Sequence, residues 1–392
     1  MIPSILLYYK KDMEIIKKKL AIFGSTGSIG RQTLDVVRAH PDRFEVTALS
    51  AGQNLSLLCK QIQEFKPEYI SLTRRDDTLS IGDAKFLEPE DIAALPEVDV
   101  VVVASAGVSG LVPTLTAAKA GKTIALANKE TLVMAGELVT RAVAAGDAEL
   151  LPVDSEHSAI WQCLQGEVTF PTHLILTASG GPFRHFTLAQ LEKVTPEQAL
   201  KHPSWQMGKK ITIDSATLVN KGLEIIEAHH FFDMPFDSII ILVHPECIIH
   251  SMVEFPDGTV KAQLGCPDMR IPIQYALAYP ERLDGTKFPR LDFNLITNLT
   301  FEEPDLVAFP GLKIAVEAGK KGGTYPAVLA GADEAAVSLF LERKIRFTDI
   351  PRLVEETLSI HTPTASPSLE EIIFAENWAR SKTLQVASGA RA

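Results

Sequence analysis

The stretch KKLAIFGSTGSIGRQTLDVVRAHP, residues 18–41, constrains the fold more than any other, because an apolar strand runs through a glycine-rich turn into an amphipathic helix. Backbone N–H groups of such a turn, together with the helix N-terminus, can approach a pyrophosphate closely. The glycine spacing is GxxGxxG rather than the usual GxGxxG, so a turn that only packs the helix tightly against the strand is the alternative. The residues expected to face a dinucleotide are Gly24, Ser25, Thr26, Gly27, Ser28 and Ile29.

This first unit is followed by further apolar strands at 44–52, 69–73, 98–107 and 122–128, with helices such as 111–121 between them. Alternating strands and helices with nearly all-apolar strands are typical of a parallel, doubly wound sheet, so we expect a Rossmann-like α/β domain.

The second strand ends without the Asp or Glu that binds the ribose 2′-OH of NAD, which favours NADP. Gln53 adds no positive charge there, so the preference is expected to be soft. The residues assigned to the cofactor at this point are Gly52, Gln53 and Asn54.

The segment LANKE ends the strand at 122–128, at the carboxyl edge where such sheets bind ligands. We therefore expect Asn128 and Glu130 on the cofactor side and Lys129 in a catalytic role. A simple ion pair between Lys129 and a neighbouring acid is the alternative.

The segment LLPVDSEHSAI, residues 150–160, places Asp154 and Glu156 two residues apart where a buried strand ends. On a strand the two carboxylates would point the same way and repel each other unless a cation lay between them. The alternative is an Asp or Ser N-cap that opens a helix at SAIWQCLQ, with Glu156 favoured near its positive end. Local evidence alone favours the cap.

The segment ITIDSATLVNKGLEIIEA supplies more acids, and we interpret it as a short strand that leads into Asp214 and Ser215 and then a helix. Glu224 and Glu227 are spaced i, i+3 and share one helix face. Carboxylates from both segments would suit Mg²⁺ or Mn²⁺, whereas the absence of a Cys cluster or HExxH motif argues against zinc. A solvated helix face is the alternative.

A phosphate site is indicated by Ser179 and two glycines at the end of an apolar strand, and by Ser215, Asn220 and Lys221. Between these segments, the loop at 201–211 carries His202 and Trp205 and is expected to be a lid that excludes solvent. A tryptophan that anchors the loop to the core is an equally common arrangement.

The motifs GSTGSIG, LANKE, LPVDSEH, SGGPFR, HPSWQMGKKITIDSATLVNKGLEIIEA, IHSMVEFPDGTVKAQL and PDMRIPIQYAL occur in this order. In this respect the chain, from about Lys19 nearly to its end, resembles the 1-deoxy-D-xylulose 5-phosphate reductoisomerase family. The resemblance implies that NADPH and a divalent metal support rearrangement and reduction of this keto-sugar phosphate to 2-C-methyl-D-erythritol 4-phosphate in non-mevalonate isoprenoid biosynthesis. It also implies a homodimer.

The resemblance further assigns roles to individual residues, beginning with metal ligation by Asp154, Glu156 and Glu224. The catalytic residues that it implies are Lys129, Glu156, His202 and Glu227. The substrate-binding residues are Ser155, Ser179, His202, Trp205, Ser215, Asn220, Lys221 and Glu224. Gly208 and Met269 join the cofactor-binding residues named above.

Three departures from the family pattern stand out. Gln53 occupies a position where members often carry a lysine beside the 2′-phosphate, and LAGADE at 329–334 replaces LNAANE, a segment expected to lie well away from the chemistry. The first 18 residues form an extension, within which Met13 is a candidate start.

The remaining features limit the function and the organisation. A net charge of −11 argues against a nucleic-acid or anionic-membrane partner, and four scattered cysteines suit a reducing cytoplasm. The rival functions are another metal-assisted NADP-dependent dehydrogenase and a catalytically inactive nucleotide-sensing relative. The expected layout is an extension (1–18), an NADPH-binding domain (19–150), a central α+β catalytic domain (151–280), a linker (281–305) and a C-terminal helical bundle (306–392).

Overall fold

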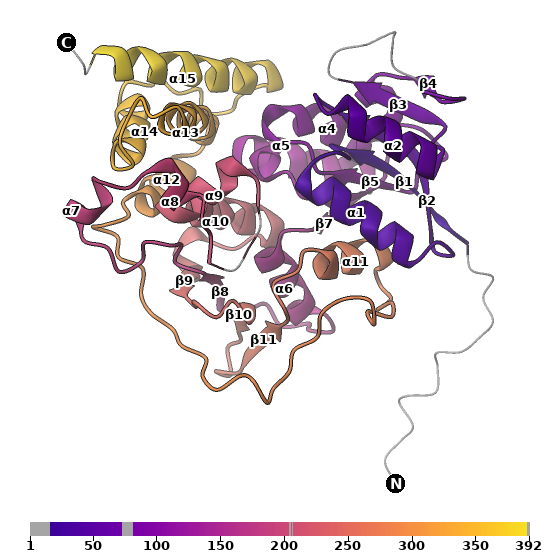
Figure 1. Cartoon of the computed structure of the whole chain (residues 1–392), viewed down its shortest axis with the longest axis horizontal. Helices are drawn as coiled ribbons and strands as arrows, with labels where there is room; N and C mark the ends of the chain where they lie inside the picture. The colour runs from indigo at the N-terminus through magenta and orange to yellow at the C-terminus, as the bar shows by residue number, and fades with distance from the viewer. Residues whose placement is uncertain (1–15, 73–80, 204, 206, 390–392) are drawn as a thin grey trace.

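The fold is known from a computed structural model that describes residues 16–72, 81–203, 205 and 207–389 (Figure 1). Most of the predicted N-terminal extension, including the candidate start Met13, lies outside the described residues. Among the residues that are described, no helix combines the length and the apolar character needed to cross a membrane.

The N-terminal region is a seven-stranded, all-parallel sheet in the order β4-β3-β2-β1-β5-β6-β7, which confirms the predicted Rossmann-like fold. Its strands are β1 (Lys18–Phe23), β2 (Phe44–Ala51), β3 (Tyr69–Leu72), β4 (Lys85–Phe86), β5 (Val100–Val103), β6 (Thr123–Leu126) and β7 (Glu149–Pro152). Its helices are α1 (Ser28–Ala39), α2 (Leu55–Phe65), α3 (Pro89–Ala93), η1 (Gly107–Gly110), α4 (Leu111–Lys119) and α5 (Lys129–Gly146). The four valines of β5 are buried on both faces, as expected for a central parallel strand.

The central region is a four-stranded mixed sheet in the order β11-β10-β8-β9, flanked by helices. Its strands are β8 (His173–Ala178), β9 (Ile239–Val243), β10 (Ile249–Glu254) and β11 (Val260–Leu264). Its helices are α6 (Ser155–Leu164), α7 (Leu188–Leu191), α8 (Pro196–Ala199), α9 (Lys209–Thr217), α10 (Val219–Phe232), η2 (Phe236–Ser238) and α11 (Arg270–Ala278). The apolar side chains of α11 join the core of the N-terminal sheet, so this helix packs beside α1.

The prediction of a short strand before Asp214 is wrong, because Lys209–Thr217 is the helix α9. The β-branched run Ile211-Thr212-Ile213 favours a strand locally. Tertiary contacts override this preference, since Ile213 is fully buried. Within the helix the Thr212 hydroxyl donates to Gly208 O at 2.7 Å. Leu218, with φ of +60°, is the single left-handed residue that separates α9 from α10.

The C-terminal region is helical, as the three- and four-residue periodicity predicts, and an irregular segment leads into it. Its helices are α12 (Gly311–Lys321), α13 (Tyr325–Leu341), α14 (Asp349–Ser359) and α15 (Leu369–Gly389). The central helix α13 is buried on nearly every side and packs against α14, α15, α5 and α9. Through α5 and α9 the helical bundle therefore reaches the other two regions.

Candidate active site

The glycine-rich turn combines close packing with an exposed edge. Gly24 has φ of +81°, and a Cβ atom at Gly30 would lie 2.3 Å from Gly24 O, so both positions require glycine. Ser25 is buried and its Oγ donates to Gln61 Oε1 at 2.8 Å, whereas Gly27 and Ser28 are exposed. The turn therefore packs tightly against its neighbours and still leaves the N-terminus of α1 open to a ligand.

The other residues assigned to the cofactor lie at the ends of elements. Gly52 and Gln53 are exposed after β2, and Asn54 caps α2 by accepting from Leu57 N. Asn128 is buried and caps α5, because its Oδ1 accepts from Thr131 N at 2.8 Å while its Nδ2 donates to Gly107 O at 2.9 Å. Gly208 is the N-cap of α9, and half-buried Met269 is the N-cap of α11.

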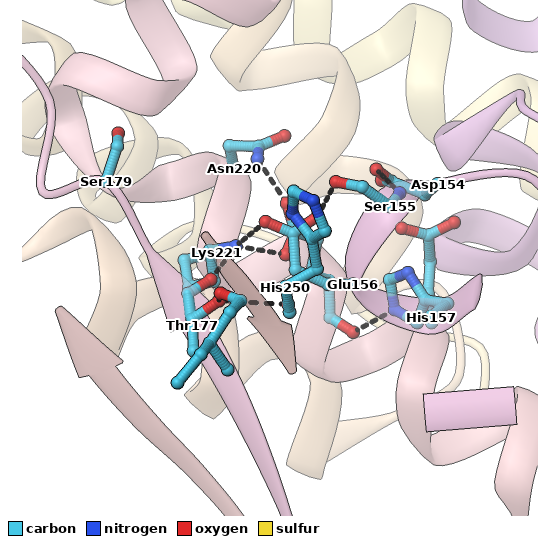
Figure 2. A network of polar contacts seen from close by, with 12 residues as sticks. Asp154, Ser155, Glu156, His157, Thr177, Ser179, Asn220, Lys221 and His250 are labelled. Carbon is cyan, nitrogen blue, oxygen red and sulfur yellow. Dashed lines mark hydrogen bonds and ion pairs between the residues drawn. The ribbon is translucent and has the colours of Figure 1, made fainter. Parts of the chain in front are cut away.

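Three of the predicted acids converge. Ligand atoms of Asp154, Glu156 and Glu224 all lie within 4.8 Å of one another, and Asp154, His157 and Glu227 form a second such set (Figure 2). Asp154 and Glu156 come from the start of α6. Glu224 and Glu227 come from the buried face of α10. The alternative of a solvated helix face is excluded, because Glu224 is only 1% exposed and Glu227 only 3%.

The cap and the acid cluster turn out to be compatible. Asp154 Oδ1 accepts from Ser155 N at 2.9 Å at the start of α6, so Asp154 is the helix N-cap that local evidence favoured. Its other oxygen accepts from the Lys129 ammonium. The carboxylate of Asp154 therefore caps the start of α6 and also belongs to the charged cluster.

Two buried lysines lie between these acids. Lys129 Nζ donates to Asp154 and, at 2.8 Å, to Glu227 Oε2. Lys221 Nζ donates to Glu156 Oε1 at 2.8 Å and to the carbonyl oxygen of Thr177 at 2.7 Å, and it also pairs with Glu224 (Figure 2). The suggested ion pair of Lys129 with a nearby acid is thus present, and it lies inside the predicted site.

The electrostatics of the cluster show how crowded its negative charges are. Burial, and then the charge of Glu156, raise the pKa of Glu224 to about 7, although Lys221 and Lys129 act in the opposite direction. Burial also raises the pKa of Glu227 to about 7 against the effect of Lys129. Four carboxylates facing two ammonium groups leave an excess of negative charge on hard oxygen donors, which a divalent cation such as Mg²⁺ fits.

The predicted phosphate and lid residues meet at the end of β8. His202 Nε2 lies 2.9 Å from Ser179 Oγ, and Trp205 N donates to His202 Nδ1 at 2.9 Å, so the ring is the Nε2–H tautomer and donates to Ser179. Burial lowers the pKa of His202 to about 4, which keeps this ring neutral. Residues 204 and 206 of the lid segment lie outside the described residues.

The remaining predicted substrate residues come from α6, α9 and α10. Ser155 Oγ donates to Glu156 Oε2 at 2.6 Å, and the Asn220 amide donates to Glu224 (Figure 2). Ser215 is half-buried on α9, near the junction with α10. In this structure Asn220 and Lys221 are therefore directed at the carboxylates.

Three site residues were not assigned a role from the sequence. Thr177 O accepts from Lys221, His157 Nε2 donates to Glu224 O at 2.9 Å, and the buried ring of His250 lies 6.1 Å from the Trp205 ring. His157 stood in the DSEH motif and His250 in IHSMVEF, so both were visible as polar residues within buried segments. The backbone role of Thr177 O has no sequence signal.

A parallel nucleotide-binding sheet whose carboxyl edge meets a buried set of converging carboxylates defines a class, the metal-assisted, dinucleotide-dependent enzymes. The chain is 54% identical over 385 residues to 1-deoxy-D-xylulose 5-phosphate reductoisomerase from Chlorobaculum tepidum, covering 94% of this chain and 99% of the relative. The chain belongs to the 1-deoxy-D-xylulose 5-phosphate reductoisomerase family.

Other comparisons agree with this assignment. Family models described as 1-deoxy-D-xylulose 5-phosphate reductoisomerase, its C-terminal domain, and the DXP reductoisomerase C-terminal domain match residues 20–136, 150–232 and 264–382. The solved reductoisomerase from Zymomonas mobilis in complex with NADPH has a TM-score of 0.86 at 42% identity, covering 95% of this chain and 98% of that chain. A solved DOX-P reductoisomerase in complex with NADPH, fosmidomycin and magnesium has a TM-score of 0.89 at 39% identity, covering 95% of this chain and 99% of that chain.

Proposed function

We propose that the chain catalyses the NADPH- and divalent-metal-dependent rearrangement and reduction of 1-deoxy-D-xylulose 5-phosphate to 2-C-methyl-D-erythritol 4-phosphate in non-mevalonate isoprenoid biosynthesis. The observation that carries this function is the convergence of Asp154, Glu156 and Glu224 within 4.8 Å beside the carboxyl edge of the nucleotide-binding sheet. Solved relatives hold NADPH and magnesium together, which supports the same pair of cofactors here.

The metal would be held by Asp154, Glu156 and Glu224. When bound, a divalent cation polarises the carbonyl and hydroxyl oxygens of a keto-sugar and stabilises negative charge on them. Lys129 is placed to assist, since its ammonium is fixed by Asp154 and Glu227 and lies 3.7 Å from Glu224 in the converging set. Glu227 holds Lys129 in place from α10.

The substrate phosphate would bind at Ser179, Ser215, Asn220 and Lys221. The neutral His202 already donates to Ser179, and the Trp205 ring lies beside that of His250. Binding of the remote phosphate would hold the lid segment 201–211 closed and exclude water from the reacting carbons. Ser155 would contact a substrate hydroxyl.

The reduced dinucleotide would lie along the glycine-rich turn, with its 2′-phosphate near Gln53 and its nicotinamide towards Met269 and Gly208. NADPH supplies the hydride for the reduction step. The domain boundaries stated above, a homodimeric assembly and a cytoplasmic location form part of the same proposal.

The test is the fall in NADPH absorbance with 1-deoxy-D-xylulose 5-phosphate, measured with and without EDTA and with NADH in parallel. We expect metal-dependent turnover that favours NADPH. Turnover of a hydroxy acid instead would identify another metal-assisted dehydrogenase, and NADPH binding without turnover in folded, metal-loaded protein would identify a nucleotide-sensing relative.

A further inference from the structure

A second buried set of charges lies apart from the metal carboxylates and joins all three regions of the chain. Its centre is Lys210 in the first turn of α9. Lys210 Nζ lies 2.6 Å from Asp214 Oδ2 one turn later, 2.8 Å from Asp333 Oδ2 on α13, and 3.9 Å from Glu130 Oε1 on α5. We call Glu130, Lys210, Asp214 and Asp333 the α9–α13 network.

The burial of this network is inconsistent with an incidental surface ion pair. The Asp333 side chain is fully buried and that of Asp214 is 3% exposed. Asp214 Oδ1 and both carboxylate oxygens of Asp333 have no hydrogen-bond partner within the part of the chain that the structure describes, so Asp333 meets Lys210 as an ion pair. Burial, and then the charge of Asp333, raise the pKa of Asp214 well above its usual value, although Lys210 acts in the opposite direction. The positive charge of Lys210 therefore stabilises both buried carboxyl groups, and removing this side chain is expected to lower the stability of the folded protein.

The geometry of the network differs from that of a metal site. Among the described residues, the sets of three candidate ligands whose atoms lie within 4.8 Å of one another include none of its acids. Its three carboxylates are arranged around one ammonium group, that of Lys210. The network is thus suited to fixing the position of Lys210.

The position of Lys210 matters because of what α9 connects. The lid segment 201–211 ends in its first turn, directly after the N-cap Gly208, and Ser215 lies one residue beyond Asp214. After Leu218 the chain enters α10, which carries Glu224. Glu130 follows Lys129 directly on α5, so one end of the network also adjoins the catalytic lysine.

We propose that Lys210, Asp214 and Asp333 are positioning residues, which hold α9 between the C-terminal bundle and α5 so that Ser215 is aligned to bind the substrate phosphate. Asp333 acts through Lys210 and touches neither substrate nor cofactor. The segment LAGADE, expected to lie well away from the chemistry, therefore contributes to the site from a distance. This inference rests on the proposed function, since it concerns the same phosphate pocket.

The experiment compares D333A, D333N and K210M with the wild-type enzyme by steady-state kinetics, with melting temperatures recorded for each. K313M is the matched control, because Lys313 is an exposed helical lysine on α12, outside the lid segment and the network. We expect the KM for 1-deoxy-D-xylulose 5-phosphate to rise about tenfold in D333A and more in K210M, with the KM for NADPH and kcat changing by less than about threefold. D333N keeps an oxygen acceptor for Lys210 and is expected to restore the KM nearly to the wild-type value.

A D333A enzyme with an unchanged substrate KM would overturn the proposal, and so would equal losses in kcat and both KM values together with a lower melting temperature. If D333A and K210M do not fold, hydrogen exchange of the wild-type amides in Lys209–Thr217 decides. Protection before any ligand is added supports the network, whereas protection that appears only with substrate and NADPH shows that the ligands order α9. This measurement needs no turnover, so it still tests the network if the proposed activity is absent.

Discussion

Two buried clusters of lysines and carboxylates lie in this molecule, and their difference shows what distinguishes a ligand site from a structural one. In the α9–α13 network, three acids are arranged around Lys210, and among the described residues no set of three mutually close ligand atoms includes them. At the active site, Asp154, Glu156 and Glu224 bring oxygens within 4.8 Å of one another, although Lys129 and Lys221 also pair with these acids. With Glu227 counted, the active site has four acids and two lysines, and the network has three acids and one lysine. The excess of acids is the same, so the metal site is distinguished by the convergence of its oxygens and not by net charge.

The clusters also differ in where their residues come from. The active-site acids lie on α6 and α10, next to the carboxyl ends of strands, where open α/β sheets bind ligands. The network instead draws Asp333 from a helix of the C-terminal bundle. A small change to one active-site acid is thus expected to abolish ligand binding directly. A change in the α9–α13 network is expected to weaken substrate binding indirectly, by shifting the position of α9.

The largest effect is expected for E224Q. Glu224 is almost completely buried and is a member of the converging set, so the amide removes a negative ligand without changing the side-chain size. We expect kcat/KM to fall by about 10³-fold or more and the magnesium requirement to rise. The measurement is NADPH oxidation over a magnesium titration.

Glu137→Gln on α5, a carboxylate exposed to solvent, is the matched control and should behave as the wild type. If E224Q retained turnover with an unchanged magnesium requirement, the converging carboxylates would not be the metal site.

A smaller effect is expected for the thermal stability of the protein with and without magnesium. Magnesium at about 100 times its Kd should stabilise the wild type by ~2.7 kcal/mol, which corresponds to a rise of about 3 °C or more in the melting temperature. The same addition should shift D333A as much as the wild type but leave E224Q unshifted. Differential scanning calorimetry with EDTA-treated protein measures this, and a lost shift in D333A would mean that the network itself binds metal.

The smallest effect is expected for the pH dependence of stability in D333N. The pKa of Asp214 is raised in the folded state by burial and by Asp333, so the folded protein binds more protons than the unfolded chain and its stability falls as pH rises through the Asp214 pKa. Removing the charge of Asp333 lowers that pKa towards its ordinary value, so this part of the decline should become smaller. The difference should amount to at most a few degrees in melting temperature between acidic and alkaline pH.

Asp237→Asn, at an exposed carboxylate paired with Lys320, is the control for a general loss of one negative charge. A D333N profile that matched the Asp237→Asn profile would show that Asp214 and Asp333 do not interact.

Much of the fold follows from the sequence because its signals are local. Apolar strands alternating with helices predict the parallel sheet, and the three- and four-residue periodicity after Leu306 predicts the bundle. The failure at Lys209–Thr217 has a definite cause. Its β-branched residues favour a strand, but Ile213 is buried against other elements and Lys210 and Asp214 pair one helical turn apart.

The site is predictable from sequence only in part. The four acids of the active site stand in two short motifs, so their residue types already indicate hard-cation chemistry. That Asp154 both caps α6 and joins the cluster could not be read from a local pattern, since each interpretation used the same residue. The role of Asp333 could not be predicted from the sequence for a different reason. This residue contacts Lys210 only because α13 packs against α9.

The place of Asp333 in the chain also bears on biosynthesis. A ribosome releases the nucleotide-binding sheet first, and domains generally fold as they emerge. Lys210 and Asp214 leave the ribosome well before Asp333, so α9 gains its third partner only after α13 has been made. The nascent protein can therefore form its parallel sheet early, whereas α11 joins the core of that sheet later and the substrate pocket is completed last.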